Sequence, residues 1–337
     1  MAYDSLKLEK GMYRNNKSFT EVLESLDPSA NYDNTALAGL DAYERQLKRF
    51  GIKVSGTDSS AVEKFFSTSD SAALFPEYIS RAVRQGAQER NLLSSVIAAK
   101  TKVNGLDYRT IASIPSGEDL ELKSVAEGAV IPETVITTQE NLVKLNKHGR
   151  MLVASYEAIR FQHLDVFTVM LRQIGAHIAS SQLKDAVDVI INGDGNSNAA
   201  SVINTVGTNT LTYDDLIALW GKFDPYELNT MLVSPQVMMK MLAIPEFKDP
   251  ATGLNFQATG KLTSPLGADI VKSSGVPQNT VIGLDRKYGL EMIVAQDVAL
   301  DSDRVIDRQL ERVTISSIAG FAKICNDASN VLKIKTA

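Results

Sequence analysis

The chain has 337 residues, 44 % hydrophobic and 22 % charged, a composition typical of a globular protein with a sizeable core. Its formal net charge of −5 argues against a protein built to grip nucleic-acid phosphates. A single cysteine, Cys325, excludes an intramolecular disulfide and suits a reducing compartment. The N-terminus lacks the features of a secretory signal, and no apolar run approaches the roughly 20 residues of a membrane span. We therefore expect a soluble, cytosolically made protein, and the length favours two domains.

The first 70 residues are polar and mixed. The stretches FTEVLESL and LAGLDAYERQLKRF have helical spacing, and the turn-rich DPSANYDNT separates them. No stretch here offers enough apolar surface for a core, so the pattern predicts an extended arm with short helices. A disordered tail is the alternative interpretation.

A helix is predicted from Pro76, followed by two runs with strand-like alternation. The first run, KVNGLDYRTIASIP, starts at Lys102, and the second returns from Ser124 toward Arg160. Together they predict a hairpin of about 45 residues, and a two-stranded hairpin is marginal in water unless it packs on something. The returning run carries charge on both faces. We therefore expect this ribbon to contribute little to its own subunit's core and to lie on another surface.

The strongest helical signal follows Asp165, a candidate cap, and continues to Ile191. At 1.5 Å per residue such a helix is about 40 Å long. Gly193 and Gly195 predict its end. The apolar stripe expected to face the core consists of Val166, Met170, Ile174, Ile178, Leu183, Val187 and Ile190.

Residues 211–303 read as a compact α/β region. Thr212 is a candidate cap for one helix, and Ser234 with Pro235 opens another. Four short strands alternate with them, in NTMLV, ADIVKSS, TVIGL and LEMIVAQ. Two further strands after Arg308 can return to the long helix and close a sheet over it.

No motif in the chain carries a specific chemistry. The Asp/Asn-rich NGDGNSN at Asn192 hints at calcium but lacks the later bidentate Glu, which favours a helix-ending loop. The three histidines, His148, His163 and His177, are not at metal-ligand spacings. Neither a phosphate-binding loop nor a nucleophile elbow is present. The sequence therefore predicts no catalytic, cofactor-binding or metal site.

The order of these parts resembles the major capsid proteins of tailed double-stranded DNA bacteriophages, which have the Hong Kong 97 fold. SVAEGAVIPE is similar to the family's returning loop strand, with its Glu-Gly step at Glu127 and Gly128. VKLNKHGRMLVASYEAIR is similar to the strand that leads into a Ser-x-Glu helix start, here Ser155 and Glu157. VIINGDGNSNAA is similar to the glycine loop after the spine helix. Two departures are Val125, where the family often has an aromatic residue, and SNAAS in place of a proline-glycine.

The resemblance implies an α+β fold of four parts: an N-terminal arm, an extended loop, a peripheral domain with the long spine helix, and an axial domain. The implied boundaries are 1–75 for the arm, 102–150 for the extended loop, 76–101 with 151–205 and 305–337 for the peripheral domain, and 206–304 for the axial domain.

The resemblance also implies a structural protein and not an enzyme. Its copies would form the pentamers and hexamers of an icosahedral shell around double-stranded DNA, which they contact only loosely. Further implied partners are a portal and scaffolding or decoration proteins, with no membrane; the location would be the virion capsid, assembled in the bacterial cytoplasm. The loop residues expected at the contact between copies are Lys123, Glu127, Lys144, Lys147 and Arg150.

Two alternatives remain at this point. One is a bacterial nanocompartment shell of the encapsulin type, which shares the fold. The other is an α/β enzyme built on residues 206–304, which would need convergent polar groups in a pocket.

Overall fold

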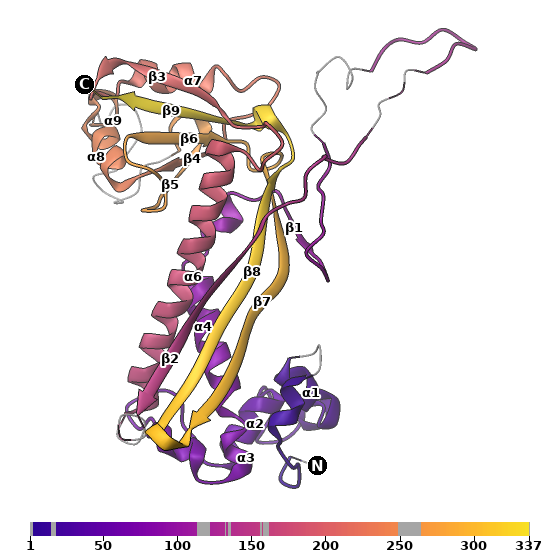
Figure 1. Ribbon diagram of the computed structural model, residues 1–337, viewed down its shortest axis with the longest axis vertical. Coiled ribbons are helices and arrows are strands. Elements are labelled where there is room, and N and C mark those ends of the chain that lie inside the picture. Colours follow the sequence, from indigo (N-terminus) through magenta and orange to yellow (C-terminus); the bar gives the residue numbers. More distant parts are fainter. Residues whose placement is uncertain are drawn as a thin grey trace. The chain divides into compact units, whose positions relative to one another are not determined.

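The computed structural model describes residues 3–14, 18–112, 122–131, 133, 136–155, 157, 162–248 and 264–336 (Figure 1). The chain divides into two compact units. Unit 1 comprises Met1–Arg90, His148–Ile178 and Val298–Ser317; unit 2 comprises Asn91–Lys147, Ala179–Asp297 and Ile318–Ala337. The division passes through one long helix and three strands.

The helices lie in both units. Their bounds are α1 Phe19–Leu26, α2 Ala42–Arg49, α3 Ser69–Ala72, α4 Phe75–Glu89, α6 Leu164–Asn192, α7 Tyr213–Trp220, α8 Pro235–Ala243 and α9 Pro245–Lys248.

The strands form two sheets (Figure 1). A four-stranded sheet has the order β1-β7-β8-β2, with β1 Ala99–Lys102, β7 Leu290–Val305, β8 Leu310–Lys323 and β2 Leu145–Ser155. A five-stranded sheet has the order β3-β9-β6-β4-β5, with β3 Ser201–Thr208, β9 Ser329–Lys335, β6 Thr280–Leu284, β4 Thr230–Val233 and β5 Asp269–Lys272.

The N-terminal region is part of the core of unit 1. Capping boxes at Ser18 and Asp41 start α1 and α2. Phe19 and Leu23 of α1 and Tyr43 of α2 are buried in one hydrophobic cluster with residues of α4 and α6. The prediction that residues 1–70 lack the apolar surface for a core is therefore wrong. Each short helix offers only two or three apolar side chains, and they become a core only when α4 and α6 gather them.

Two glycines let α4 and α6 cross closely within unit 1. A Cβ atom on Gly175 of α6 would overlap the carbonyl oxygen of Val83, and one on Gly86 of α4 would overlap the backbone of Arg172. The crossing therefore excludes any larger side chain at these two positions.

Gly175→Ala is expected to destabilise the folded chain. Alanine gains about 1 kcal/mol in helix propensity over glycine, but overpacking at a backbone contact costs about 1–3 kcal/mol or more. Chemical denaturation followed by circular dichroism should show a lower midpoint. Gly105→Ala is the matched control, because a Cβ there meets nothing within 4 Å. A midpoint for Gly175→Ala at or above that of the control would contradict the close crossing.

The buried face of α6 differs from the predicted stripe at its N-terminal end. Val166 and Met170 are exposed, whereas Leu164, Leu171 and Ile178 are buried. The helix begins at Leu164, so Asp165 lies in its first turn, where its carboxylate accepts from the N–H of Val166 at 2.8 Å. Both faces of this segment carry apolar residues, so the position of α4, and not the periodicity, selects the face that is buried.

The five-stranded sheet of unit 2 has helices on both faces. Met231 and Val233 of β4 pack in one cluster with residues of α7 and α8, while Leu232 packs in another with the C-terminal half of α6. The predicted caps are confirmed, because Thr212 accepts from the N–H of Asp215 and Ser234 from that of Val237. The long helix also ends as predicted, at a loop in which Gly193 and Gly195 have φ of +83° and +98°.

Candidate functional site

The extended loop presents apolar side chains to solvent. Leu122 is 98 % exposed, Val130 89 % and Ile131 74 %. The base of the predicted hairpin is present, because Ile111 and Thr138 form an antiparallel bridge. Backbone hydrogen bonds extend this pairing, from Ala112 to Thr137, from Gln139 to Thr110 and from Val143 to Tyr108. Isolated apolar residues on a surface are ordinary, but several on one projecting segment mark an interaction surface.

A tight turn, residues 126–129, lies in this exposed part and is called the tip turn below. The N–H of Ala129 donates to the carbonyl of Ala126 at 3.0 Å. Gly128, at the third position, has φ of +79°, the conformation that a type II turn requires there. Glu127 therefore occupies the second position, and both Glu127 and Lys123 are exposed.

The base of the extended loop belongs to the core of unit 2. The buried carboxylate of Glu291 in β7 accepts from the hydroxyls of Thr101, Tyr108 and Thr110. Burial, followed by the hydrogen bond to Glu291, raises the pKa of Tyr108. Val143 is buried in a small apolar cluster of unit 2. The expectation that the whole ribbon contributes little to its own core is thus wrong for the base, because it anchors on β7.

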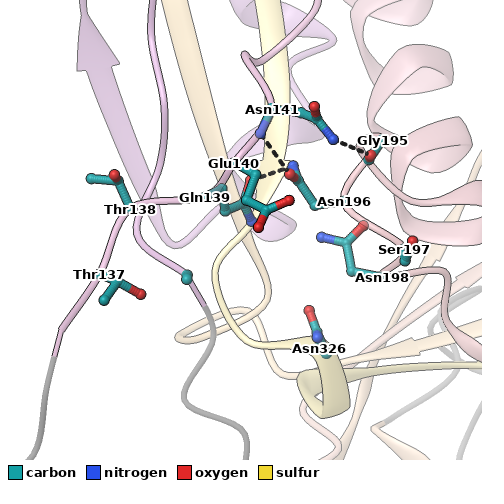
Figure 2. A pocket seen from close by; sticks show the side chains of 11 residues that line it. Thr137, Thr138, Gln139, Glu140, Asn141, Gly195, Asn196, Ser197, Asn198 and Asn326 are labelled. Carbon is teal, nitrogen blue, oxygen red and sulfur yellow. Dashed lines mark hydrogen bonds between the residues drawn. The ribbon is translucent and has the colours of Figure 1, made fainter.

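A polar cavity of about 540 Å³ lies beside this base, within unit 2. Figure 2 shows its walls, which come from residues 137–141 of the extended loop, residues 195–198 of the loop after α6, and Asn326. Asn141 donates from its main chain to Asn196 Oδ1 at 3.0 Å and from its side chain to the Gly195 carbonyl at 2.8 Å. Asn196 in turn donates to Gln139 Oε1 at 2.7 Å. These bonds hold the two loops together.

The end of β8 fixes both loops. The N–H of Lys323 donates to Asp194 Oδ2 at 3.0 Å, and the carbonyl of Lys323 accepts from Gln139 Nε2 at 3.2 Å. The cavity is therefore a built feature, since one strand residue ties together the loop after α6 and the base of the extended loop.

The side chain of Lys323 is buried, and its Nζ makes no hydrogen bond with the described residues. Burial lowers the pKa of Lys323 from 10.5 to about 8, although Asp194 and Asp327 act in the opposite direction. Between these two pH values the unfolded chain keeps a proton that the folded chain has lost. The contribution of Lys323 to the free energy of unfolding therefore rises as the pH increases from about 8 to about 10.5.

Lys323→Met is expected to stabilise the chain near pH 7, because it removes a buried ammonium that lacks a hydrogen-bond partner. It should also flatten the rise in the free energy of unfolding between about pH 8 and about pH 10. Urea denaturation at several pH values measures both effects. Lys333→Met, an exposed position in β9, is the control that should change neither. A lower stability of Lys323→Met than of the control at pH 7 would contradict this assignment.

The five residues predicted at the contact between copies are all exposed. Lys123 and Glu127 lie at or near the tip turn, Lys144 and Lys147 lie just before and in β2 within unit 2, and Arg150 lies in the part of β2 that belongs to unit 1. Of the predicted helix start, Ser155 ends β2 and Glu157 has helical conformation, while residues 156 and 158–161 lie outside the described residues.

Sequence reasoning missed the cavity residues Gln139, Asn196 and Asn198. The Asn-rich run after the long helix was a signal for a polar site. Alone, this run favours a helix-ending loop, because its partners lie more than 50 positions away in the chain, as the bond between Asn141 and Asn196 shows.

Two kinds of feature are absent from the described part of the chain. There, no three His, Cys, Asp or Glu side chains gather as a metal site would require. No helix there combines the length and the apolar character needed to cross a bilayer.

The chain matches a family of known proteins and the fold of several solved structures. Residues 138–334 match a family described as "Phage capsid protein". The capsid of cyanophage P-SCSP1u is similar at 14 % identity over 72 % of this chain and 88 % of that chain, with a TM-score of 0.52. The capsid of the native GTA particle is similar at 14 % identity over 75 % of this chain and 91 % of that chain, with a TM-score of 0.52. Mycobacterium phage Che8 is similar at 12 % identity over 75 % of this chain and 90 % of that chain, with a TM-score of 0.51. Comparison with curated proteins gives no match. With the α+β architecture described above, the chain belongs to the phage capsid protein family and has the Hong Kong 97 fold.

Proposed function

We propose that this chain is the major capsid protein of a tailed bacteriophage or prophage. Its copies assemble into pentamers and hexamers that close an icosahedral shell around double-stranded DNA. One observation carries the proposal beyond family membership. The extended loop exposes large apolar side chains that the described part of its own chain leaves uncovered, as in Leu122, Val130 and Ile131. Such a loop is stabilised when a neighbouring copy covers it.

The parts of the chain take the roles that the resemblance gives them. Residues 76–101, 151–205 and 305–337 form the peripheral domain, and residues 206–304 form the axial domain that meets its copies at the ring centres. The extended loop, 102–150, lies on a neighbour, where its exposed charged residues pair with groups of the other chain. Residues 1–75 are the N-terminal arm, whose helices support the peripheral domain.

The remaining roles are those of a structural protein. The chain catalyses no reaction and is located in the virion capsid after assembly in the bacterial cytoplasm. A portal joins the shell, with scaffolding or decoration proteins as further partners. The net charge of −5 favours loose contact with the packaged DNA, because an acidic wall does not bind phosphates tightly.

Expression of the chain alone is expected to give large hollow shells, visible by negative-stain microscopy and by fast sedimentation. Small shells of uniform size would instead favour a nanocompartment. Discrete oligomers of a few copies, under all assembly conditions, would contradict a shell protein and favour an enzyme or a binding module.

A further inference from the structure

We infer that the cavity of Figure 2 is the receptor for the tip turn of a second copy of this chain. In this contact Glu127 of one copy accepts a hydrogen bond from Asn198 of the next, and Lys123 pairs with Glu140. The inference rests on the proposed self-assembly and names the two surfaces that meet.

The cavity contains a buried donor that needs an acceptor. Asn198 is 4 % exposed, and its Nδ2 makes no hydrogen bond with the described residues. Its Oδ1 accepts from the N–H of Asp194 at 3.0 Å, which fixes the orientation of the amide. Figure 2 shows the nitrogen end turned toward the side of the cavity where Gln139 and Glu140 lie. Leaving such a donor unsatisfied is costly, so a ligand with an acceptor is stabilised there.

Further donors line the same cavity. The hydroxyls of Thr137, Thr138 and Ser197 make no hydrogen bond to other described residues. The carboxylate of Glu140 stands exposed at the cavity, without an ion pair in the described part of the chain. The cavity thus presents several neutral donors and one negative charge. Its size falls within the range of about 300–1,000 Å³ typical of binding pockets.

The tip turn carries the complementary groups. The carboxylate of Glu127 only accepts hydrogen bonds, and it stands at the second position of a tight turn, where it projects. Lys123, three residues earlier, supplies a positive charge. Neither side chain bonds to another described residue. A carboxylate that accepts from an amide forms a charge-assisted hydrogen bond, which is shorter and stronger than a neutral one.

This pairing joins two different surfaces of the chain. The tip turn consists of residues 126–129, and none of these lines the cavity. A contact between unlike surfaces is head-to-tail, so it repeats from copy to copy and can close as a ring. The proposed pentamers and hexamers are rings of this kind. A contact of the tip turn with another tip turn would stop at a dimer.

A disulfide between copies tests the inference directly. Ala126→Cys places a thiol in the tip turn, and Thr138→Cys places one at the cavity, in a Cys325→Ser background that removes the natural thiol. Shells assembled under reducing conditions are then oxidised, denatured and run on a non-reducing gel. We expect a ladder of linked chains that ends at closed rings of five and six. Ala126→Cys with Ser274→Cys, an exposed position of unit 2 away from the cavity, should give none.

Shells that contain only single chains, intrachain disulfides or dimers after oxidation would overturn the inference while the proposed function stands. Equal ladders from the control pair would overturn it as well. If the unaltered chain forms no shells, the proposed function fails and this inference fails with it.

If the cysteine variants do not assemble, exchanging the charges of Lys123 and Glu140 tests the same contact between copies. Lys123→Glu and Glu140→Lys should each lower the apparent association constant between copies about tenfold, which corresponds to about 1.4 kcal/mol. The double variant should recover to within about twofold of the unaltered chain, because the pair is restored with its charges exchanged. A double variant as defective as the sum of the two single variants would overturn the inference.

Discussion

Deleting residues 113–136 and joining Ala112 to Thr137 through a Gly-Ser link is expected to give a folded chain that forms no shells. The two ends already lie together, since the N–H of Ala112 donates to the carbonyl of Thr137 at 2.8 Å and Ile111 bridges Thr138. The base of the extended loop keeps its contacts with Glu291 and β8. What is lost is the exposed apolar part of the loop, which we propose is covered by a neighbouring copy. Circular dichroism, sedimentation velocity and negative-stain microscopy measure folding and assembly separately.

The longer deletion of residues 104–147 is the informative control. It removes Tyr108 and Thr110 from Glu291 and takes Val143 out of its buried cluster. A buried carboxylate without donors costs several kcal/mol, so this variant is expected to lose soluble protein as well as assembly. Closed shells from the shorter deletion, or an insoluble product, would show that the exposed part of the loop has a different role.

Asp27→Ala is expected to cost about 3 kcal/mol of folding free energy, because it removes the buried carboxylate that bonds directly to the Arg45 guanidinium. The partly exposed carboxylate of Glu24, 3.8 Å from the guanidinium, then remains as its acidic partner. Arg45 of α2 is fully buried, and its Nε donates to Asp27 Oδ2 at 3.1 Å. The same carboxylate accepts from the hydroxyl of Tyr32 at 2.7 Å through its other oxygen. The substitution therefore leaves two buried donors without their partner.

Urea denaturation is best measured on the chain that lacks residues 113–136, so that assembly does not contribute to the midpoint. Asp58→Ala is the control, because the pair of Asp58 with Lys53 is exposed and its atoms are 3.9 Å apart. Exposed pairs contribute about 0–1 kcal/mol. An effect of Asp27→Ala no larger than that of Asp58→Ala would mean that residues 18–49 are not integral to the fold of unit 1.

The sequence by itself determined the order of the helices and strands and the ends of several elements, while the resemblance to a known family implied the α+β class. Thr212 and Ser234 start their helices as predicted, and Gly193 ends α6. Strands β4, β5, β6 and β9 lie where short apolar runs between turn residues predict them, whereas β7 begins as predicted but continues to Val305. These features depend on neighbours within a few positions, since caps, turns and strand alternation are local interactions that a single sequence displays.

Only the tertiary structure decided which of these surfaces are buried and where a polar site forms. Phe19 and Tyr43 join a core because α4 and α6 gather them, and α6 buries Leu164 and Leu171 instead of Val166 because of its close crossing with α4. The cavity with Asn198 exists because β8 brings the loop after α6 to the base of the extended loop. Each of these outcomes depends on contacts between residues far apart in the chain, and local patterns of hydrophobicity and propensity carry no information about which distant segments will meet.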